Sequence, residues 1–205
     1  MKKIKDKLIT IYPQLIFLIV TFCIFMPSSL FLGNIDQFAV GFAALIPLLM
    51  AASLITAAVV ILIGLIVPKK ICNIYAAVIF GGALAAYVQG NFLNPDFGVL
   101  NGRQIQWSQF KVNGIISTVV WIVLIVVPPV IVCFKKDIMT NIIKWGSLFL
   151  SSIQVVTLVV LIVSSKRSVD YSYVVTKNDE FALSSQGNVV VFIVDTLDNE
   201  DAQNY

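Results

Sequence analysis

The amino-acid sequence predicts an all-α polytopic membrane domain with five transmembrane helices, followed by the first β-strand of an α/β domain. Of the 205 residues, 59% are hydrophobic and only 12% are charged, whereas charged residues make up roughly a quarter of a soluble domain. The mean hydropathy is +0.93. Water could not solvate the surface that such a composition would give a compact soluble fold. The chain is therefore predicted to be an integral membrane protein.

Five apolar runs are long enough to cross a bilayer, whose hydrocarbon core of roughly 30 Å requires about 20 residues of helix. They cover residues 12–32, 38–67, 71–90, 112–134 and 142–163. The first run follows several lysines, as the apolar part of a signal peptide does, but it is longer, and no small-residue cleavage site follows it. We therefore expect the first run to be a retained helix, and residues 1–165 to form one membrane domain.

Lysines indicate the orientation, because cytoplasmic loops of membrane proteins carry an excess of positive charge. They lie before the first span and in the connections that follow the second and fourth spans: Lys2, Lys3, Lys5, Lys7, Lys69, Lys70, Lys135 and Lys136. These are alternate connections, as a single cytoplasmic side requires. Lys166 and Arg167, after the fifth span, favour the opposite orientation but are outnumbered. We predict a multi-pass protein of the cell membrane with a cytoplasmic N-terminus and an extracytoplasmic C-terminal segment.

Several function classes are disfavoured by what the sequence lacks. It has no histidine, so it can supply neither a histidine metal ligand nor a histidine general base. In the fourth and fifth spans the only charge is Lys144, near one end, where it can extend to the interface. Ion carriers usually place charged residues at membrane depth, so a secondary transporter is disfavoured. The positive charges flank apolar runs, so no nucleic-acid binding is predicted. The three cysteines are far apart and are interpreted as buried hydrophobic residues.

Helix packing is the interpretation of the small residues and prolines within the spans. Gly82, Ala86 and Gly90 recur every four residues, which suits a close helix–helix contact in lipid. Pro47 in the second span, and Pro128 and Pro129 in the fourth, are expected to kink or locally break their helices.

The connection between the third and fourth spans combines turn-forming residues with Phe92, Phe97, Ile105 and Trp107. Two interpretations remain open. In the first, the loop is an interfacial segment with an aromatic belt. In the second, it contacts a lipid headgroup, with Arg103 at the phosphate and Trp107 beside it as candidate substrate-binding residues.

The composition changes after residue 165. Residues 166–186 are mixed and polar, as expected of an extracytoplasmic linker, and residues 187–205 are expected to begin an α/β domain. Residues 189–194 are six consecutive β-formers, typical of a strand buried on both faces. Asp195 comes next, at the carboxyl end of this strand, where open α/β sheets bind ligands. So short a segment cannot form such a domain, so we expect the sequence to stop at the start of a larger domain.

The five spans, the outer linker and the segment Asn188-Val-Val-Val-Phe-Ile-Val-Asp195 resemble the membrane-anchored sulfatase-like proteins of the alkaline phosphatase superfamily. Lipoteichoic acid synthases and phosphoethanolamine transferases share this layout. The segment Tyr87-Val-Gln-Gly-Asn-Phe-Leu-Asn94 is similar to the corresponding loop of bacterial sulfatase-like membrane proteins.

The resemblance implies a hydrolase or transferase that acts on phosphate or sulfate esters outside the membrane. It also implies a divalent metal cation as cofactor, with Asp195 as one ligand, and a nucleophile that lies beyond Tyr205. A metal ion held at a strand end would polarise an ester oxygen. Thr196 departs from the family, because many sulfatases have a second aspartate there. The alternative role for Asp195 is to cap the next helix.

The sequence leaves two functional hypotheses. The first is the membrane anchor of a metal-dependent ester hydrolase or transferase, inactive as this segment alone, with membrane lipids and a lipid-linked substrate as partners. The second is a complete, non-enzymatic accessory protein whose tail strand pairs with the sheet edge of a partner. The oligomeric state stays open.

Overall fold

The computed structural model describes residues 2–35, 38, 41–95, 97 and 105–165. The chain divides into two units, of which the first comprises residues 1–96 and 106–168 and the second residues 97–105 and 169–205. Every described helix belongs to the first unit, the helical unit. In the second unit only Phe97 and Ile105 are described.

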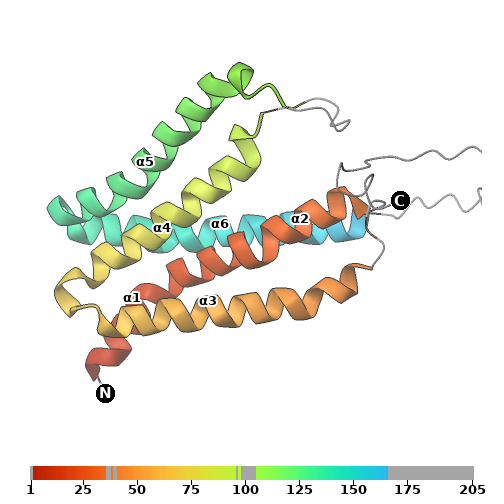
Figure 1. Ribbon diagram of the computed structural model, residues 1–205. Helices are drawn as coiled ribbons and strands as arrows, with labels where there is room; N and C mark the ends of the chain where they lie inside the picture. The colour runs from red at the N-terminus through yellow and green to blue at the C-terminus, as the bar shows by residue number, and fades with distance from the viewer. Residues whose placement is uncertain (1, 36–37, 39–40, 96, 98–104, 166–205) are drawn as a thin grey trace, which may run out of the picture. The chain divides into compact units, whose positions relative to one another are not determined.

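The helical unit consists of five long helical segments (Figure 1). The first segment runs through α1 (Lys2–Leu18), the π-helix η1 (Ile19–Phe25) and α2 (Met26–Gly33). The second combines the 3₁₀ turn η3 (Phe42–Leu45) with α3 (Ile46–Ile66). The third comprises η4 (Lys69–Ile71), α4 (Cys72–Val88) and the π-helix η5 (Gln89–Leu93). The fourth and fifth are η6 (Trp107–Phe110) with α5 (Lys111–Phe134), and α6 (Lys136–Ser164).

All five segments are long and apolar enough to cross a membrane, which confirms the predicted all-helical membrane domain. They differ from the predicted runs at their ends, and cover Lys3–Gly33, Phe42–Ile66, Lys69–Leu93, Trp107–Phe134 and Lys136–Ser164. The described residues contain no β-strand. The predicted strand at residues 189–194 lies outside them.

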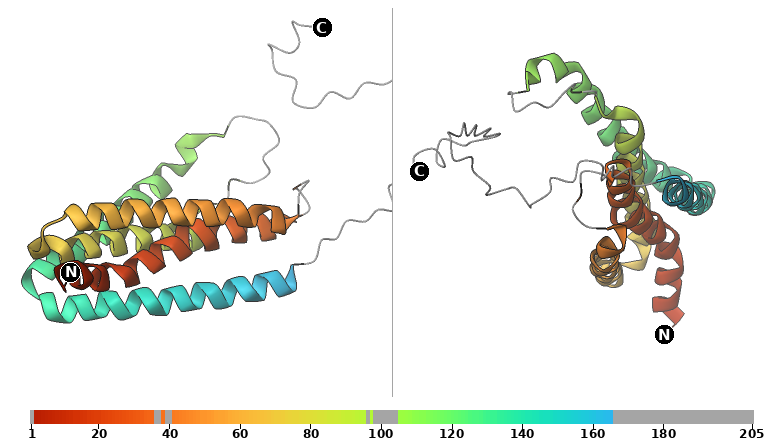
Figure 2. Two further views of the ribbon diagram at one scale, coloured as in Figure 1. Left: turned by 90° about the horizontal axis from the view of Figure 1, so that it is seen from below. Right: turned by 90° about the vertical axis from the view of Figure 1, so that its right-hand side faces the viewer.

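The first and third segments form the interior of the unit, and the other three surround them. Half of the most apolar stretch of the third segment and 44% of that of the first are buried, against 11–17% in the other three. α1 packs against α3, α4 and α6, and α4 packs against α1, α5 and α6. Figure 2 shows α3 and α6 on opposite sides of the first segment. The outward faces of α3, α5 and α6 are therefore left for lipid.

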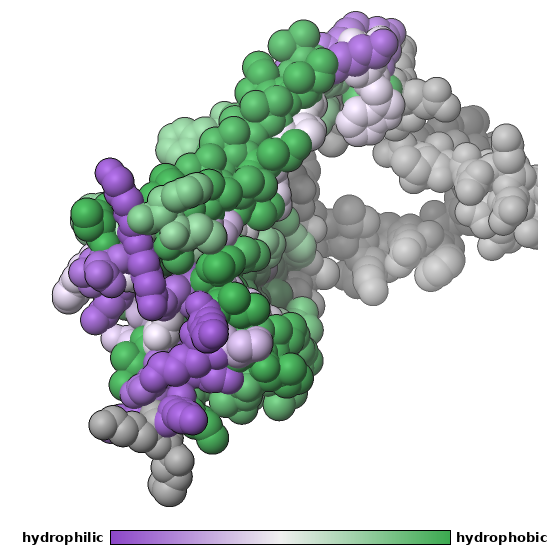
Figure 3. Space-filling view, turned by 90° about the vertical axis from the view of Figure 1, so that its left-hand side faces the viewer, coloured by the Kyte–Doolittle hydropathy of each residue, from purple (hydrophilic) through white to green (hydrophobic). Residues whose placement is uncertain are grey.

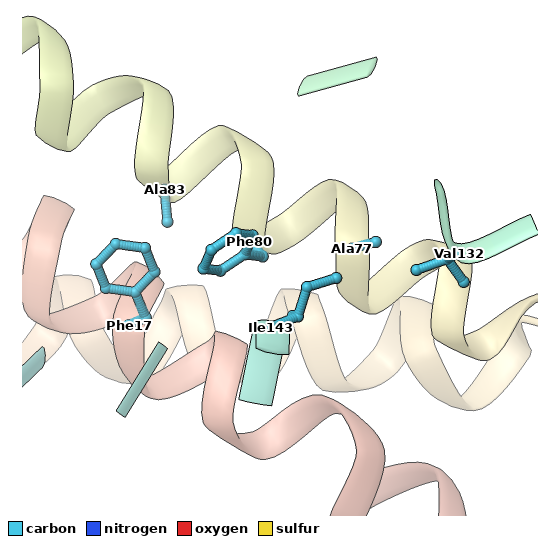
Figure 4. Close-up of a cluster of buried hydrophobic side chains, with 6 residues drawn as sticks. All are labelled: Phe17, Ala77, Phe80, Ala83, Val132 and Ile143. Atoms are coloured by element: carbon cyan, nitrogen blue, oxygen red, sulfur yellow. The ribbon is translucent and has the colours of Figure 1, made fainter. Parts of the chain in front are cut away.

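A hydrophobic cluster joins α1, α4, α5 and α6 at the centre of the unit (Figure 4). It consists of Phe17, Ala77, Phe80, Ala83, Val132 and Ile143. The Phe17 and Phe80 rings lie 5.9 Å apart, centroid to centroid. Lipid tails are as apolar as these side chains, so a hydrophobic driving force contributes little here. Close packing and its dispersion energy hold the cluster together instead.

Charged side chains gather at one end of the helices, the purple region facing the viewer in Figure 3. We call it the lysine end, defined by Lys3, Lys5, Lys7, Lys69, Lys70, Lys135 and Lys136. There Lys69 Nζ lies 2.8 Å from Asp6 Oδ2. Lys7 Nζ donates to the carbonyls of Leu65 (2.7 Å) and Val67 (2.6 Å), where α3 ends. A cation beside these last carbonyls is favourable because it complements the helix dipole.

The close contact between α4 and α5 is made by Gly81, one position from the predicted stripe of Gly82, Ala86 and Gly90. Within the stripe, Ala86 is buried and a Cβ at Gly90 would lie 2.8 Å from Met26 Cε, so these two residues do lie in helix contacts. A Cβ at Gly81 would collide with the carbonyl oxygen of Leu124 and lie 3.0 Å from Ile125 Cα, whereas a Cβ at Gly82 would meet nothing within 4 Å. Pro128 explains this, because it has no N–H to donate to the carbonyl of Leu124 four residues earlier. The released carbonyl lies against α4 where a side chain is missing.

The other prolines also differ from expectation. Pro47 does not interrupt a helix: it lies in the first turn of α3, after the 3₁₀ turn η3, where a missing N–H costs nothing. α5 remains helical through Pro128 and Pro129, so the expected break is not there. Pro27, which was not singled out from the sequence, lies just after η1. Because Pro27 cannot donate to the carbonyl of Cys23, the preceding turn is free to widen into a π-helix.

Candidate functional site

An apolar groove lies between α3 and α6 in the half of the unit opposite the lysine end. Its volume is about 440 Å³, within the range of pockets that bind small molecules. The first segment contributes Ile19, Ile24 and Ser28, and α6 contributes Leu158 and Ile162. The remaining lining residues come from the start of the second segment: Phe42, Ile46, Leu49, Met50, Ser53 and Leu54. No charged side chain lines the groove.

Local sequence explains why a groove forms there. α3 and α6 both pack against η1, and α6 also packs against α2, so the first segment forms its floor. Ser28 and Ser53 are small where larger side chains would close the space. Ile46, Met50 and Leu54 keep 45–69% of their surface exposed, so the groove is open along α3. In a bilayer, the molecules that reach such an opening are lipids.

Two serine hydroxyls are the polar groups of the groove, and they differ in their partners. Ser53 Oγ donates to the carbonyl of Leu49 within its own helix (2.7 Å). Ser28 is fully buried, and its Oγ has no hydrogen-bond partner among the described residues. A buried hydroxyl without a partner is costly.

A buried polar contact joins the first segment to α6 beside the groove. Gln154 Nε2 donates to Thr21 Oγ1 (3.0 Å), and Thr21 Oγ1 lies 3.2 Å from Gln154 Oε1. Both side chains are at most 1% exposed. At the end of α6, Ser165 Oγ donates to the carbonyl of Leu32 (3.4 Å). These contacts fix α6 against the first segment and so hold that side of the groove.

None of the residues singled out from the sequence is among the described residues that line the groove. Asp195, the predicted metal ligand, and Arg103, the predicted phosphate contact, are outside the described residues. Trp107 begins η6 and is 66% exposed, next to neither the groove nor the buried polar contact. Within the part of the chain that the structure describes, no three Cys, Asp or Glu side chains gather closely enough to hold a metal ion.

The groove residues were missed because each is an ordinary apolar or small residue of a membrane span. Their grouping depends on which helices are neighbours, and a uniformly apolar helix does not indicate which face meets protein. The one usable signal was Pro27 beside Ser28 in the middle of an apolar run. No protein-family model, curated protein or solved structure matches this chain.

Proposed function

We propose that the five helices are the membrane domain of a sulfatase-like, metal-dependent hydrolase or transferase that acts on a lipid-linked phosphate or sulfate ester outside the membrane. In this proposal the groove between α3 and α6 holds the hydrocarbon chain of the lipid. One observation supports this lipid-holding role of the helices most directly: the groove is apolar, is open to the side, and lies in the half of the unit opposite the lysine end.

The orientation supports the placement of the groove. If the lysine end is cytoplasmic, as the excess of positive charge favours, the groove lies in the outer half of the bilayer. Five spans then put residues 166–205 on the outer side as well. A lipid held in the groove would thus present its headgroup on the side where the tail begins.

The lining supports a hydrocarbon chain as the occupant. Apart from Ser28 and Ser53, every lining side chain is apolar. Moving a chain from bilayer to groove gains little hydrophobic free energy, because both surroundings are apolar. The groove therefore fixes the position of the lipid more than it strengthens lipid binding.

The chemical part of the proposal rests on the sequence resemblance. Asp195 would be one ligand of a divalent cation, which would polarise the ester oxygen of the substrate. Arg103 and Trp107 stay candidates for contact with the headgroup.

The lipid-holding role is tested by filling the groove. Ser53→Phe places a ring in it, whereas Ala51→Phe, two residues earlier on α3, places the same ring on an exposed position outside the lining. In nanodiscs that contain a lipid with a photoreactive acyl chain, we expect S53F to lower cross-linking at Leu158 and Ile162 and A51F to leave it unchanged. Equal cross-linking in both variants would contradict the role.

The enzymatic part is tested separately, in membranes of the source cell. An antibody against residues 169–186 should detect a native product much heavier than 22.5 kDa, and those membranes should cleave or transfer a lipid phosphate or sulfate ester in a reaction that a metal chelator stops. A product of 22.5 kDa would contradict the enzyme and favour an accessory protein whose tail binds a partner. The cross-linking experiment on the groove does not depend on this outcome.

A further inference from the structure

A second cavity, of a different character, lies between α1, α4 and α6 toward the lysine end. Its volume is about 190 Å³, equal to the share of liquid volume of about six water molecules. Polar side chains supply most of its lining: Thr10, Gln14, Asn73, Thr140, Asn141 and Lys144. No acidic side chain lines it. This cavity has no role in the proposed function above.

Gln14 shows that the cavity is a built polar site within a membrane helix. Its side chain is 2% exposed. Its Nε2 donates to the carbonyls of Thr10 (2.8 Å) and Ile11 (3.2 Å) of its own helix. Its Oε1 then faces donor groups, so both ends of the amide are satisfied. Pro13 adds to this arrangement, because without an N–H it leaves the carbonyl of Ile9 without a helical donor.

The hydroxyls of the cavity are acceptors. Thr10 Oγ1 donates to the carbonyl of Asp6 (3.0 Å), and Thr140 Oγ1 donates to the carbonyl of Lys136 (2.9 Å). Because each hydroxyl has one hydrogen, both oxygens can only accept from a molecule in the cavity. One face of the cavity therefore requires a ligand that donates hydrogen bonds.

The donors are Lys144, Asn73 and Asn141. None of the three has a hydrogen-bond or ion-pair partner among the described residues; Lys144 Nζ lies 5.3 Å from the ring centroid of its neighbour Trp145. With no acidic side chain in the lining, Lys144 gives the cavity a positive charge that attracts anions. Phosphate oxygens are the acceptors that such a charge and two amides would bind.

From this division into an anion-binding side and an accepting side, we infer that the cavity binds a phosphate ester that carries hydroxyl groups. Lys144 and the two asparagines contact the phosphate, and the hydroxyls donate to the side-chain oxygens of Thr10 and Thr140. The ligand is either the headgroup of an anionic phospholipid in the leaflet at the lysine end or a soluble polyol phosphate. The cavity is too small for an acyl chain.

The test compares lipids that differ in charge and in hydroxyl groups. The purified full chain in nanodiscs is titrated with phosphatidylglycerol, phosphatidic acid and phosphatidylcholine, and bound lipid is counted by native mass spectrometry. We expect phosphatidylglycerol to bind most tightly. Soluble glycerol phosphate, titrated in a parallel arm, identifies the source: saturable binding assigns a soluble ligand, and its absence beside lipid binding assigns the headgroup.

Three variants separate the cavity from the charged surface around it. Lys144→Gln removes the charge and should weaken phosphatidylglycerol and phosphatidic acid alike, by about tenfold. Thr140→Val removes one acceptor without changing the shape, and should weaken only phosphatidylglycerol. Lys70→Gln, an exposed lysine outside the cavity, should change binding by less than about twofold.

Two results would overturn the inference. One is an equal loss of binding in K144Q and K70Q, which would assign binding to the lysine surface as a whole. The other is equal affinity for phosphatidylglycerol and phosphatidic acid together with no effect of T140V on either. That result would show that the threonine oxygens do not accept hydrogen bonds from the ligand. Thermal unfolding in phosphatidylcholine alone verifies that each variant is folded. A variant that unfolds there is replaced by Asn73→Asp, which keeps the shape but repels phosphate and should abolish binding.

Discussion

Thr21 and Gln154 form a buried hydrogen-bonded pair between the first segment and α6. We expect Thr21→Val and Gln154→Leu to show a coupling energy of about 0.6 kcal/mol, and at most about 1.7 kcal/mol, as found for such pairs within membranes. A double-mutant cycle of unfolding in mixed micelles measures it. Ser152→Ala is the control, because Ser152 is exposed and bonds only to its own helix; coupling of the same size between T21V and S152A would contradict the pairing.

Ser28 and Ser29 are neighbours with opposite surroundings. Ser28 Oγ is buried without a described partner, whereas Ser29 Oγ donates to the carbonyl of Met26 (3.0 Å). Ser28→Ala removes an unsatisfied group, so it should leave the free energy of unfolding unchanged or raise it by about 1 kcal/mol.

Unfolding in mixed micelles measures the change, and Ser29→Ala, which removes a hydroxyl that has a partner, is the control. A free energy of unfolding that falls by more than about 1 kcal/mol in S28A would show that Ser28 Oγ has a hydrogen-bond partner.

At the scale of elements, the contact between α4 and α5 depends on a glycine that faces a carbonyl released by a proline. Gly81→Val should force the helices apart and lower the free energy of unfolding by about 1–3 kcal/mol, the usual cost of overpacking. Gly82→Val adds the same side chain one position later, into open space, and should cost less than about 0.5 kcal/mol. Unfolding in mixed micelles measures the free energy of unfolding of both variants. An equal loss in G81V and G82V would contradict the assignment of Gly81 to the contact with α5.

This pair of glycines also shows how far the sequence could predict the fold. Length and hydropathy were enough to place five helices, because a bilayer leaves a long apolar run few alternatives. The packing face was found only in part: Ala86 and Gly90 of the predicted stripe are packed and Gly82 is not. These helices are apolar all round, so their hydropathy does not mark an interface. The choice of Gly81 over Gly82 depends on Pro128 in a neighbouring helix, and periodicity within α4 contains no information about it.

The two cavities were beyond prediction for the same reason. Each is lined by side chains from three of the helical segments, so its existence depends on which helices are neighbours. In the sequence, Gln14 is only an uncharged residue of a span and Lys144 only a lysine near a span end. Only the fold brings both residues to the lining of one cavity.

At the scale of the whole molecule, the lysines at one end of the helices support one orientation in the membrane. Two of these lysines also make contacts within the unit. Lys7 Nζ donates to a carbonyl at the end of α3, and Lys69 forms an ion pair with Asp6. Lys7→Met should lower the free energy of unfolding more than Lys69→Met, because Lys7 donates to two carbonyls while the Lys69–Asp6 pair is exposed and worth at most about 1 kcal/mol. Unfolding in mixed micelles compares them; a larger loss in K69M would contradict this account.

The most direct test of the central claim, that residues 166–205 serve a reaction outside the membrane, is their location. In a variant without Cys23, Cys72 and Cys133, single cysteines are introduced as Lys70→Cys and Ser185→Cys, and intact cells are treated with a membrane-impermeant maleimide. We expect S185C to be labelled at once and K70C only after the cells are permeabilised. Labelling of K70C but not S185C in intact cells would contradict the orientation, and with it the proposed function.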